Sequence, residues 1–190
     1  MKKEIILASA SPRRRELLGM FDVSFTVIPA VGEEKSEAGL APGETVEALA
    51  RAKAAEVAAK HQNAIVIGSD TVVERDGELL GKPQSEEDAF RMLRSLSGRS
   101  HRVWSGICVM DAERCLTAHE VTAVHFRDLA DEEICAYIRS GEPMDKAGSY
   151  GCQGRASLFI DRLEGDFFNV MGLPLCRLGL MLKELGVELL

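Results

Sequence analysis

Short runs of apolar, often β-branched residues alternate with segments of helical pattern, and this alternation limits the fold more than any other feature. Ile5–Ala8 is a short apolar run that Ser and Pro end, so it predicts a buried strand. Glu44–Lys60 is rich in Ala, with apolar residues at helical spacing, and predicts a helix. Ala64–Val73 predicts another buried strand, and Asp76-Gly77 has the composition of a hairpin turn.

The same patterns predict strands at Val23–Ile28, His101–Met110, Leu116–Phe126 and Ser157–Leu163, helices at Pro12–Met20, Ser85–Leu96, Glu132–Ile138 and Leu173–Leu185, and loops at Val31–Gly43 and Gly141–Gly154. Strands that alternate with helices, plus one antiparallel stretch, indicate an α/β fold around a mixed β-sheet.

The size and charge of the chain bound what it can do. Its 190 residues suffice for one sizeable domain, or for two lobes that share a core, but not for two independent large domains. The formal net charge of -7 disfavours a general role in coating DNA or RNA, because an acidic surface repels a long polyanion. A nucleotide ligand is still allowed, since a few Lys and Arg side chains can gather in one cleft.

Cysteine usage and the N-terminus indicate a cytoplasmic protein. The five cysteines have no CxxC spacing and fit neither a disulfide framework nor a zinc site, so we expect reduced, mostly buried thiols. The apolar run Ile5–Ala8 is too short for the core of a signal peptide, and no later stretch is long enough to span a membrane. We therefore expect a cytoplasmic protein that does not interact with membranes.

The segment from Ser9 to Arg15 is the first candidate for a functional site. A strand leads into a turn, Ser11 can cap the helix that follows, and free backbone N–H groups at such a turn attract anions. Arg13 and Arg14 lie in the first helical turn, where positive charge is unfavourable for the helix dipole, so their presence suggests that something negative binds there. An ordinary capped surface helix with solvated arginines explains the turn equally well.

Asp70 is a second candidate, because it is an acid within a run that is otherwise largely apolar and β-branched. A buried carboxylate is costly unless it is paired or binds a metal, so Asp70 is a candidate metal ligand or general base. A structural Asp that accepts backbone N–H groups at a strand end is an equal alternative. Glu33 and Glu34 in the preceding loop could help to hold a metal, although exposed loop carboxylates are usually solvated.

Two lysines could supply positive charge to an anion. Lys53 shares the apolar face of its predicted helix with Val57, and a lysine on that side requires an anionic partner. Lys82 lies in the turn after the predicted hairpin and could reach back toward a cleft. Most lysines are solvated surface residues, however, so the position of Lys82 alone is weak support.

The glycine-rich segment Met144–Gly154 combines charge, conformational freedom and an amide. Its glycines let the backbone approach a ligand closely, and Lys146 places a positive charge beside Asp145. Gln153 offers a donor and an acceptor, which suits the edge of a nucleobase. A tight turn with one surface ion pair is the plainer explanation of the same residues.

Other chemistries find little support in the sequence. The four histidines have no metal-ligand spacing and no evident nucleophile nearby, so we reject a zinc site and a catalytic triad. A glycine-rich loop that ends in Lys-Ser or Lys-Thr is absent, which argues against a kinase of the P-loop kind.

Taken in order, these segments resemble the Maf family of nucleotide pyrophosphatases nearly from end to end. No single segment is decisive, but their joint order and spacing are highly specific. The resemblance is carried by Ser9-Ala10-Ser11-Pro12-Arg13-Arg14, Glu33, Ala52-Lys53-Ala54, Gly68-Ser69-Asp70-Thr71-Val72-Val73, Gly81-Lys82-Pro83, Leu96-Ser97-Gly98 and Asp145-Lys146-Ala147-Gly148-Ser149-Tyr150-Gly151. The last of these segments, with Gln153, resembles the branch that acts on dTTP and UTP, whereas Cys152 departs from the Ile expected there.

The resemblance implies one domain over residues 1–190, with two lobes around a twisted mixed β-sheet and a central cleft. It implies hydrolysis between the α- and β-phosphates of a nucleoside triphosphate, with Mg²⁺ or Mn²⁺, to the monophosphate and pyrophosphate. Such an enzyme could remove non-standard nucleotides; it would need no nucleic acid polymer, and a homodimer is allowed. Rival functions are a 7-methyl-GTP pyrophosphatase and a non-catalytic regulator of cell division, since the family is associated with inhibition of septum formation.

Residue roles follow from the resemblance together with the charge of the substrate. A triphosphate brings about four negative charges that the transition state must have neutralised, and Arg13, Lys53 and Lys82 suit that task. Asp70 is expected to hold the metal with Glu33 and to accept the proton of the attacking water. Thr71 and Gln153 are expected to contact the base. The residues expected to bind substrate are Ser9, Ser11, Arg13, Arg14, Lys53, Thr71, Lys82, Lys146 and Gln153.

Overall fold

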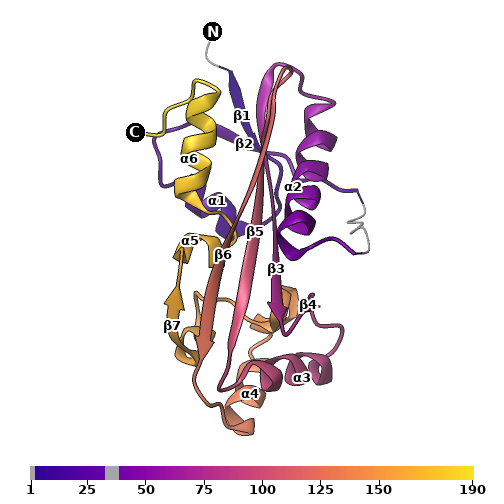
Figure 1. Ribbon diagram of the computed structural model, residues 1–190, viewed down its shortest axis with the longest axis vertical. Helices are drawn as coiled ribbons and strands as arrows, with labels where there is room; N and C mark the ends of the chain where they lie inside the picture. The colour runs from indigo at the N-terminus through magenta and orange to yellow at the C-terminus, as the bar shows by residue number, and fades with distance from the viewer. Residues whose placement is uncertain (1–2, 33–38) are drawn as a thin grey trace. The chain divides into compact units, whose positions relative to one another are not determined.

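The computed structural model describes residues 3–32 and 39–190 and shows a mixed α/β structure (Figure 1). The chain divides into two compact units. Unit 1 contains the residues up to Asp70, Ser105–Glu120 and Gly172–Leu190, and unit 2 contains Thr71–Trp104 and Val121–Met171. The α/β class, the mixed sheet and the presence of two units confirm the fold expected from the sequence.

Seven strands form one mixed sheet. The strands are β1 (Glu4–Leu7), β2 (Phe25–Val27), β3 (Ala64–Arg75), β4 (Glu78–Leu80), β5 (Ser100–Met110), β6 (Cys115–Phe126) and β7 (Ile160–Glu164). The helices are α1 (Pro12–Leu18), α2 (Pro42–Ala58), α3 (Glu86–Leu96), α4 (Asp131–Ile138), α5 (Phe167–Val170) and α6 (Leu175–Glu184), and the 3-10 turns are η1 (Glu142–Asp145), η2 (Ala147–Ser149) and η3 (Arg155–Phe159). The strand order is β2-β1-β3-β5-β6-β7, and β4 pairs with β3 outside this path. No helix in the described ranges is long and apolar enough to cross a membrane.

Parallel strands form the sheet at the start of unit 1. β1 pairs in parallel with both β2 and β3, so that Ile5 lies beside Phe25 and Ile65. Parallel neighbours require a crossover connection, which α1 provides between β1 and β2, and α2 then leads the chain from β2 back to β3 on the other side of β1. Residues 5–8 and 64–67 are all buried, as expected of parallel strands covered on both faces.

Helix α2 packs its backbone directly against two glycines of the sheet. A Cβ atom at Gly68 would lie 2.2 Å from the carbonyl oxygen of Ala50, and one at Gly106 would lie 2.2 Å from that of Val46. Both separations are far below van der Waals contact, so only glycine fits at either position. Because Val46 and Ala50 are one helical turn apart, the two contacts fix both the height and the rotation of α2 over the sheet.

A hairpin and an antiparallel edge strand characterise unit 2. β3 turns into β4 through Asp76 and Gly77, whose φ angles of 53° and 85° confirm the predicted two-residue turn. β7 runs antiparallel to β6, with Arg162 beside His125. α3 begins at Ser85, whose hydroxyl accepts a hydrogen bond from a backbone N–H in the first helical turn.

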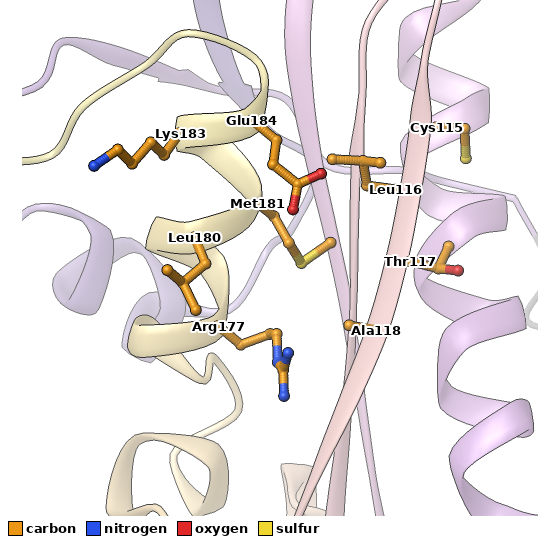
Figure 2. Close-up of a pocket in the computed structure, with 9 residues that line it drawn as sticks. All are labelled: Cys115, Leu116, Thr117, Ala118, Arg177, Leu180, Met181, Lys183 and Glu184. Carbon is orange, nitrogen blue, oxygen red and sulfur yellow. The ribbon is translucent and has the colours of Figure 1, made fainter.

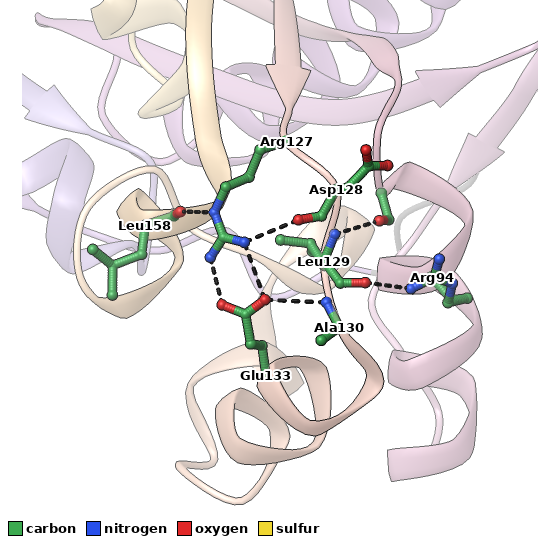
Figure 3. A network of polar contacts seen from close by, with 8 residues as sticks. Arg94, Arg127, Asp128, Leu129, Ala130, Glu133 and Leu158 are labelled. Carbon is green, nitrogen blue, oxygen red and sulfur yellow. Dashed lines mark hydrogen bonds and ion pairs between the residues drawn. The ribbon is translucent and has the colours of Figure 1, made fainter.

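An ion pair stabilises the connection between β6 and α4 (Figure 3). The guanidinium of Arg127 holds both carboxylate oxygens of Glu133, at 2.6 and 3.0 Å, and its Nε donates to the carbonyl of Leu158 at 2.8 Å. Glu133 also accepts the backbone N–H of Ala130 at 3.0 Å. The hydrogen bond from Arg127, followed by that from Ala130, lowers the pKa of Glu133 to about 2. Both side chains are well exposed, so the pair orients this connection more than it stabilises the fold.

The strand predicted over Ser157–Leu163 is wrong in its first half. The chain forms the 3-10 turn η3 up to Phe159, and β7 begins at Ile160. The hydroxyl of Ser157 donates to the carbonyl of Gly154 at 2.7 Å. A local bond of this kind offers the backbone an alternative to the strand ladder. The four-residue helix α5 is also absent from the predicted elements.

Candidate active site

The turn between β1 and α1 is built on the hydroxyl of Ser9. Ser9 is buried, and its Oγ accepts the backbone N–H of Ser11 at 3.2 Å. Ser11 occupies the N-cap position and Pro12 the first helical position, as predicted. Within the described part of the chain, however, the Ser11 side chain makes no capping hydrogen bond. The serine that closes the turn is therefore Ser9.

Arg14 and Arg13 have different surroundings although they are neighbours. Arg14 donates through Nε to the carbonyl of Gly172 at 2.8 Å, and through Nη1 to Ser69 O at 2.9 Å and Ser9 Oγ at 3.3 Å. Ser69 Oγ also donates to Gly172 O, at 2.9 Å. Arg13 is half-buried, and no residue in 3–32 or 39–190 pairs with its side chain. Arg14 thus holds the turn against β3, whereas no described residue uses the donors of Arg13.

Asp70 and Lys53 form an ion pair between β3 and α2. Lys53 Nζ contacts Asp70 Oδ1, and the two side chains are 18% and 10% exposed respectively. Lys53 lies on the buried side of α2, as predicted, and Asp70 is the anionic partner that such a lysine requires. Mutual attraction offsets part of the cost of burying both charges.

The Asp70 carboxylate has the chemistry of a ligand for a divalent metal. In the described ranges, no three His, Cys, Asp or Glu side chains come close enough to hold a metal ion by themselves. Glu33, the other predicted ligand, lies outside the described residues. Mg²⁺ commonly uses one or two carboxylates and completes its shell with substrate phosphates and water. The buried Asp70 carboxylate fits that kind of shared site and not a cage built by the protein alone.

In unit 2, the side chain of Lys146 turns into its own loop. Its Nζ lies 2.6 Å from Asp145 Oδ1 and donates to the carbonyl of Glu142, also at 2.6 Å, and the side chain is only 11% exposed. Its stem is so close to Gly151 that a Cβ there would lie 2.9 Å from Lys146 Cε. The surface ion pair weighed at the sequence level is present, but its lysine is largely buried.

The backbone of this loop is tied to the turn that carries Lys82. Gly148 N donates to Gly81 O at 3.0 Å, and both Gly148 and Ser149 have left-handed φ angles, 67° and 62°. Lys82 and Gln153 are exposed, and neither side chain has a charged partner among the described residues. Their positions leave both side chains available to a ligand.

The predicted site residues are therefore distributed over both units. Unit 1 carries Ser9 in the turn after β1, Arg14 on α1, Lys53 on α2 and Asp70 on β3, and unit 2 carries the half-buried Thr71 with Lys82, Lys146 and Gln153. Sequence reasoning missed the carbonyl of Gly172, which has no side chain to signal it. It also missed the buried pair His101 and Tyr150, whose Nε2 and hydroxyl oxygen lie 2.6 Å apart.

A pocket of about 860 Å³ lies in unit 1 between the start of β6 and α6, as Figure 2 shows. It contains none of the predicted site residues. Arg177 at its wall is paired with Glu120 at 2.8 Å, so its charge is already offset. Cys115, also at the wall, is exposed, contrary to the expectation of mostly buried thiols, and its Sγ lies 3.7 Å from that of Cys108.

Comparison with known proteins places these features in context. A sequence model of the family described as Maf-like protein matches residues 4–185. A dTTP/UTP pyrophosphatase of Dictyoglomus turgidum is 48% identical over 193 residues, with 100% of both chains covered. One of Pelotomaculum thermopropionicum is 50% identical over 190 residues, covering 99% of this chain and 100% of the other. Among solved structures, a HAM1 protein from Coxiella burnetii shares the fold, with a TM-score of 0.55 at 18% identity over 96% of this chain and 100% of that one.

Proposed function

Because the chain belongs to the Maf family, we propose that it hydrolyses dTTP and UTP to the nucleoside monophosphate and pyrophosphate. Relatives named dTTP/UTP pyrophosphatase match over essentially the full length of both chains, which supports the same substrates. The observation that carries the chemistry is the buried carboxylate of Asp70 on β3, which is paired with Lys53 of α2. The match over residues 4–185 supports a single Maf-like domain.

Positive side chains with no charged partner among residues 3–32 and 39–190 would bind the triphosphate. Arg13 has polar donors that no described residue uses, and Lys82 is exposed. Helix α1 has only seven residues, so the guanidinium of Arg13 supplies more charge at this turn than the helix dipole does. In this assignment Ser9, Ser11 and Arg14 shape the turn, and Arg13 contacts a phosphate as a planar donor.

Asp70 would act as the general base on the attacking water. A Mg²⁺ or Mn²⁺ ion held by Asp70 and Glu33 would supply charge neutralisation on the phosphate oxygens and would acidify a water. Lys53 orients the Asp70 carboxylate and keeps its charge paired in the absence of substrate. The carboxylate then accepts the proton as the water oxygen attacks the phosphorus.

The nucleobase would be read by residues of unit 2. Gln153 is exposed and can both donate and accept, which matches the acceptor–donor–acceptor edge of uracil or thymine. Thr71, next to Asp70 along β3, offers a hydroxyl for the same purpose. The buried contacts of Lys146 support a role in shaping this loop over a direct contact with substrate.

The direct test is a panel of nucleoside triphosphates with Mg²⁺ or Mn²⁺, in which both released phosphate species are measured. We expect dTTP and UTP to give the monophosphate and pyrophosphate in equal amounts. Orthophosphate as the product would indicate a phosphatase, and no turnover on any nucleotide would leave a regulator of cell division. A preference for 7-methyl-GTP would overturn the substrate assignment but not the cleavage chemistry.

Replacing Gln153 by Ala should alter selectivity more than rate. A polar group left unpaired by the wrong base penalises that base, so we expect the ratio of kcat/KM for UTP over 7-methyl-GTP to fall roughly tenfold or more. Gln62→Ala, which changes an exposed glutamine of unit 1, is the matched control and should leave the ratio unchanged. Equal losses on all substrates in Gln153→Ala would show that Gln153 does not read the base.

A further inference from the structure

A buried polar pair lies beneath the loop that carries Gln153. His101, at the start of β5, is 3% exposed and Tyr150 is 5% exposed, and a hydrogen bond of 2.6 Å joins His101 Nε2 to the Tyr150 hydroxyl. Phe126 completes a cluster of three rings that meet edge to face, with centroid separations of 4.8 to 5.3 Å. All three residues belong to unit 2. Neither polar atom takes part in the mechanism described above.

Both members of the pair are neutral near pH 7. Burial lowers the pKa of His101 to about 3, and the neighbouring His125 adds to the shift. Burial also raises the pKa of Tyr150 well above its usual value, with smaller contributions from Cys152 and Tyr137. The bond is therefore one between neutral groups, and its strength does not depend on pH across the physiological range.

The backbone directly before Tyr150 adopts a left-handed turn that surrounding contacts must hold. Gly148 and Ser149 directly before it have left-handed φ angles, and for Ser149 this conformation is strained. Ser149 is fully buried, and its hydroxyl donates to the sulfur of Met92 at 3.1 Å, which is a weak acceptor. Backbone strain of this kind persists only where surrounding contacts impose it. Tyr150, the next residue along the chain, is buried and can supply such a contact.

We propose that His101 and Tyr150 are positioning residues, whose hydrogen bond fixes the loop that presents Gln153 and Lys82 to the nucleotide. The bond holds Tyr150, which sets the left-handed turn at Gly148 and Ser149. This left-handed turn places Gly148 N against the carbonyl oxygen of Gly81, and Gly81 is the residue before Lys82. Gln153 lies only three residues after Tyr150 on the other side. This inference rests on the proposed function for its substrate, but not for its geometry.

Tyr150→Phe tests the proposal, because it deletes the hydroxyl and keeps the ring in the aromatic cluster. Loss of a buried hydrogen bond should raise KM for dTTP roughly tenfold, while kcat stays within about twofold because Asp70 and Lys53 are untouched. His101→Leu should have the same effect, and the double variant should be no worse than either single one, since both changes remove one bond. His101→Gln, whose amide can reach the hydroxyl, should restore much of the affinity.

Thr122→Val separates positioning from a general loss of stability. Thr122 is a fully buried hydroxyl of unit 2 that bonds Asp166 and Asn169, away from this loop. It should lower the melting temperature at least as much as Tyr150→Phe and leave KM unchanged. The proposal is overturned if both variants change KM alike, or if Tyr150→Phe lowers kcat and leaves KM as in the wild type.

Hydrogen exchange keeps this test independent of the proposed activity. If the wild-type protein cleaves no nucleoside triphosphate, the proposed function fails, but exchange can still be compared in the full chain. We expect backbone amides of residues 145–154 to exchange faster in Tyr150→Phe than in wild type or Thr122→Val. Unchanged exchange in that segment would overturn the positioning role whatever the enzyme does.

Discussion

Unit 1 and unit 2 hold their candidate site residues by opposite means. In unit 1, three of the charged side chains are locked, whereas Arg13 pairs with no described residue: Lys53 is paired with Asp70, and Arg14 donates to carbonyls on two other segments. In unit 2, Lys82 and Gln153 are exposed, the backbone beside Lys82 is tied by the hydrogen bond from Gly148 N to Gly81 O, and the Lys146 ammonium turns inward. Under the proposed function, the paired residues of unit 1 include the general base Asp70, and the exposed residues of unit 2 include Gln153, which would read the nucleobase.

Substitution of a buried, paired charge and substitution of an exposed loop side chain should have different effects on rate, stability and ligand choice. Removing a buried charge changes the reaction or leaves its partner unpaired, so rate or stability must fall. Removing an exposed side chain from a preformed loop changes which ligand binds, at little cost to the fold. Variants in unit 1 can therefore be ranked by expected effect, and each tests whether this division holds.

Asp70→Asn should have the largest effect. The change is nearly isosteric but removes the carboxylate that takes the proton, so we expect kcat to fall by about 10²–10⁴ while the protein stays folded. Asp76→Asn is the matched control, because it changes an exposed acid in a turn whose left-handed φ of 53° Asn tolerates. Steady-state kinetics measure kcat, and a melting curve checks that the variant is folded. Activity of Asp70→Asn within a few-fold of wild type would exclude Asp70 as the general base.

Lys53→Met should have the next largest effect, and it should lower both the stability of the protein and the reaction rate. It leaves the Asp70 carboxylate buried without its partner, which should cost about 1–3 kcal/mol in the free energy of unfolding, less than for a fully buried pair because both ends are partly exposed. The measurement is denaturant unfolding. Adding Asp70→Asn should recover stability, since both charges are then gone. Lys60→Met, an exposed lysine after α2, is the control, and equal behaviour of the two would show that Lys53 is not locked.

Asp111→Asn sharpens the comparison with a locked charge outside the site. Burial would raise the pKa of Asp111, but hydrogen bonds from Lys3 and from the backbone of Glu113 and Arg114 lower it to about 2. Because the folded pKa lies below the unfolded value near 4, this stability is present above about pH 4 and is lost as pH falls through about 2. We expect wild type to exceed the variant by about 1–2 kcal/mol at pH 7, allowing for partial screening.

The measurement for Asp111→Asn is the free energy of unfolding at a series of pH values, with Asp161→Asn, an exposed acid, as the control. The difference from wild type should shrink between pH 4 and pH 2 for Asp111 only. The reaction rate at pH 7 should not change for either variant. A pH-independent difference would mean that the Asp111 carboxylate is not the source of the stability.

Much of the fold could be predicted because its signals are local. The buried strand around Asp70, the turn at Asp76-Gly77 and the Ala-rich helix α2 each follow from residues adjacent in sequence. The placement of Lys53 on the buried face of α2 followed from helical periodicity alone, and with it the need for an anionic partner. Where the pattern of one segment determines the outcome, a single sequence suffices.

The rest of the site depends on groups that leave no mark in the sequence. Two acceptors of Arg14 are carbonyl oxygens 55 and 158 residues away along the chain, and any residue could supply them. Nothing near Lys146 in the sequence distinguishes a side chain that faces a ligand from one that bonds the carbonyl of Glu142. His101 and Tyr150, 49 residues apart, are each unremarkable until the fold places them together.

The contact of α2 with Gly68 and Gly106 limits how this protein can evolve. Each added Cβ would meet a backbone carbonyl oxygen, and no substitution on the helix can remove a backbone atom. A substitution at either glycine therefore cannot be compensated by a second single substitution. The spacing between α2 and the sheet should stay constant during evolution. Lys53 and Asp70, which flank that contact, keep their geometry while surrounding sequence drifts. Laboratory selection for new nucleotide preferences should accordingly accumulate its changes in the exposed loop residues of unit 2.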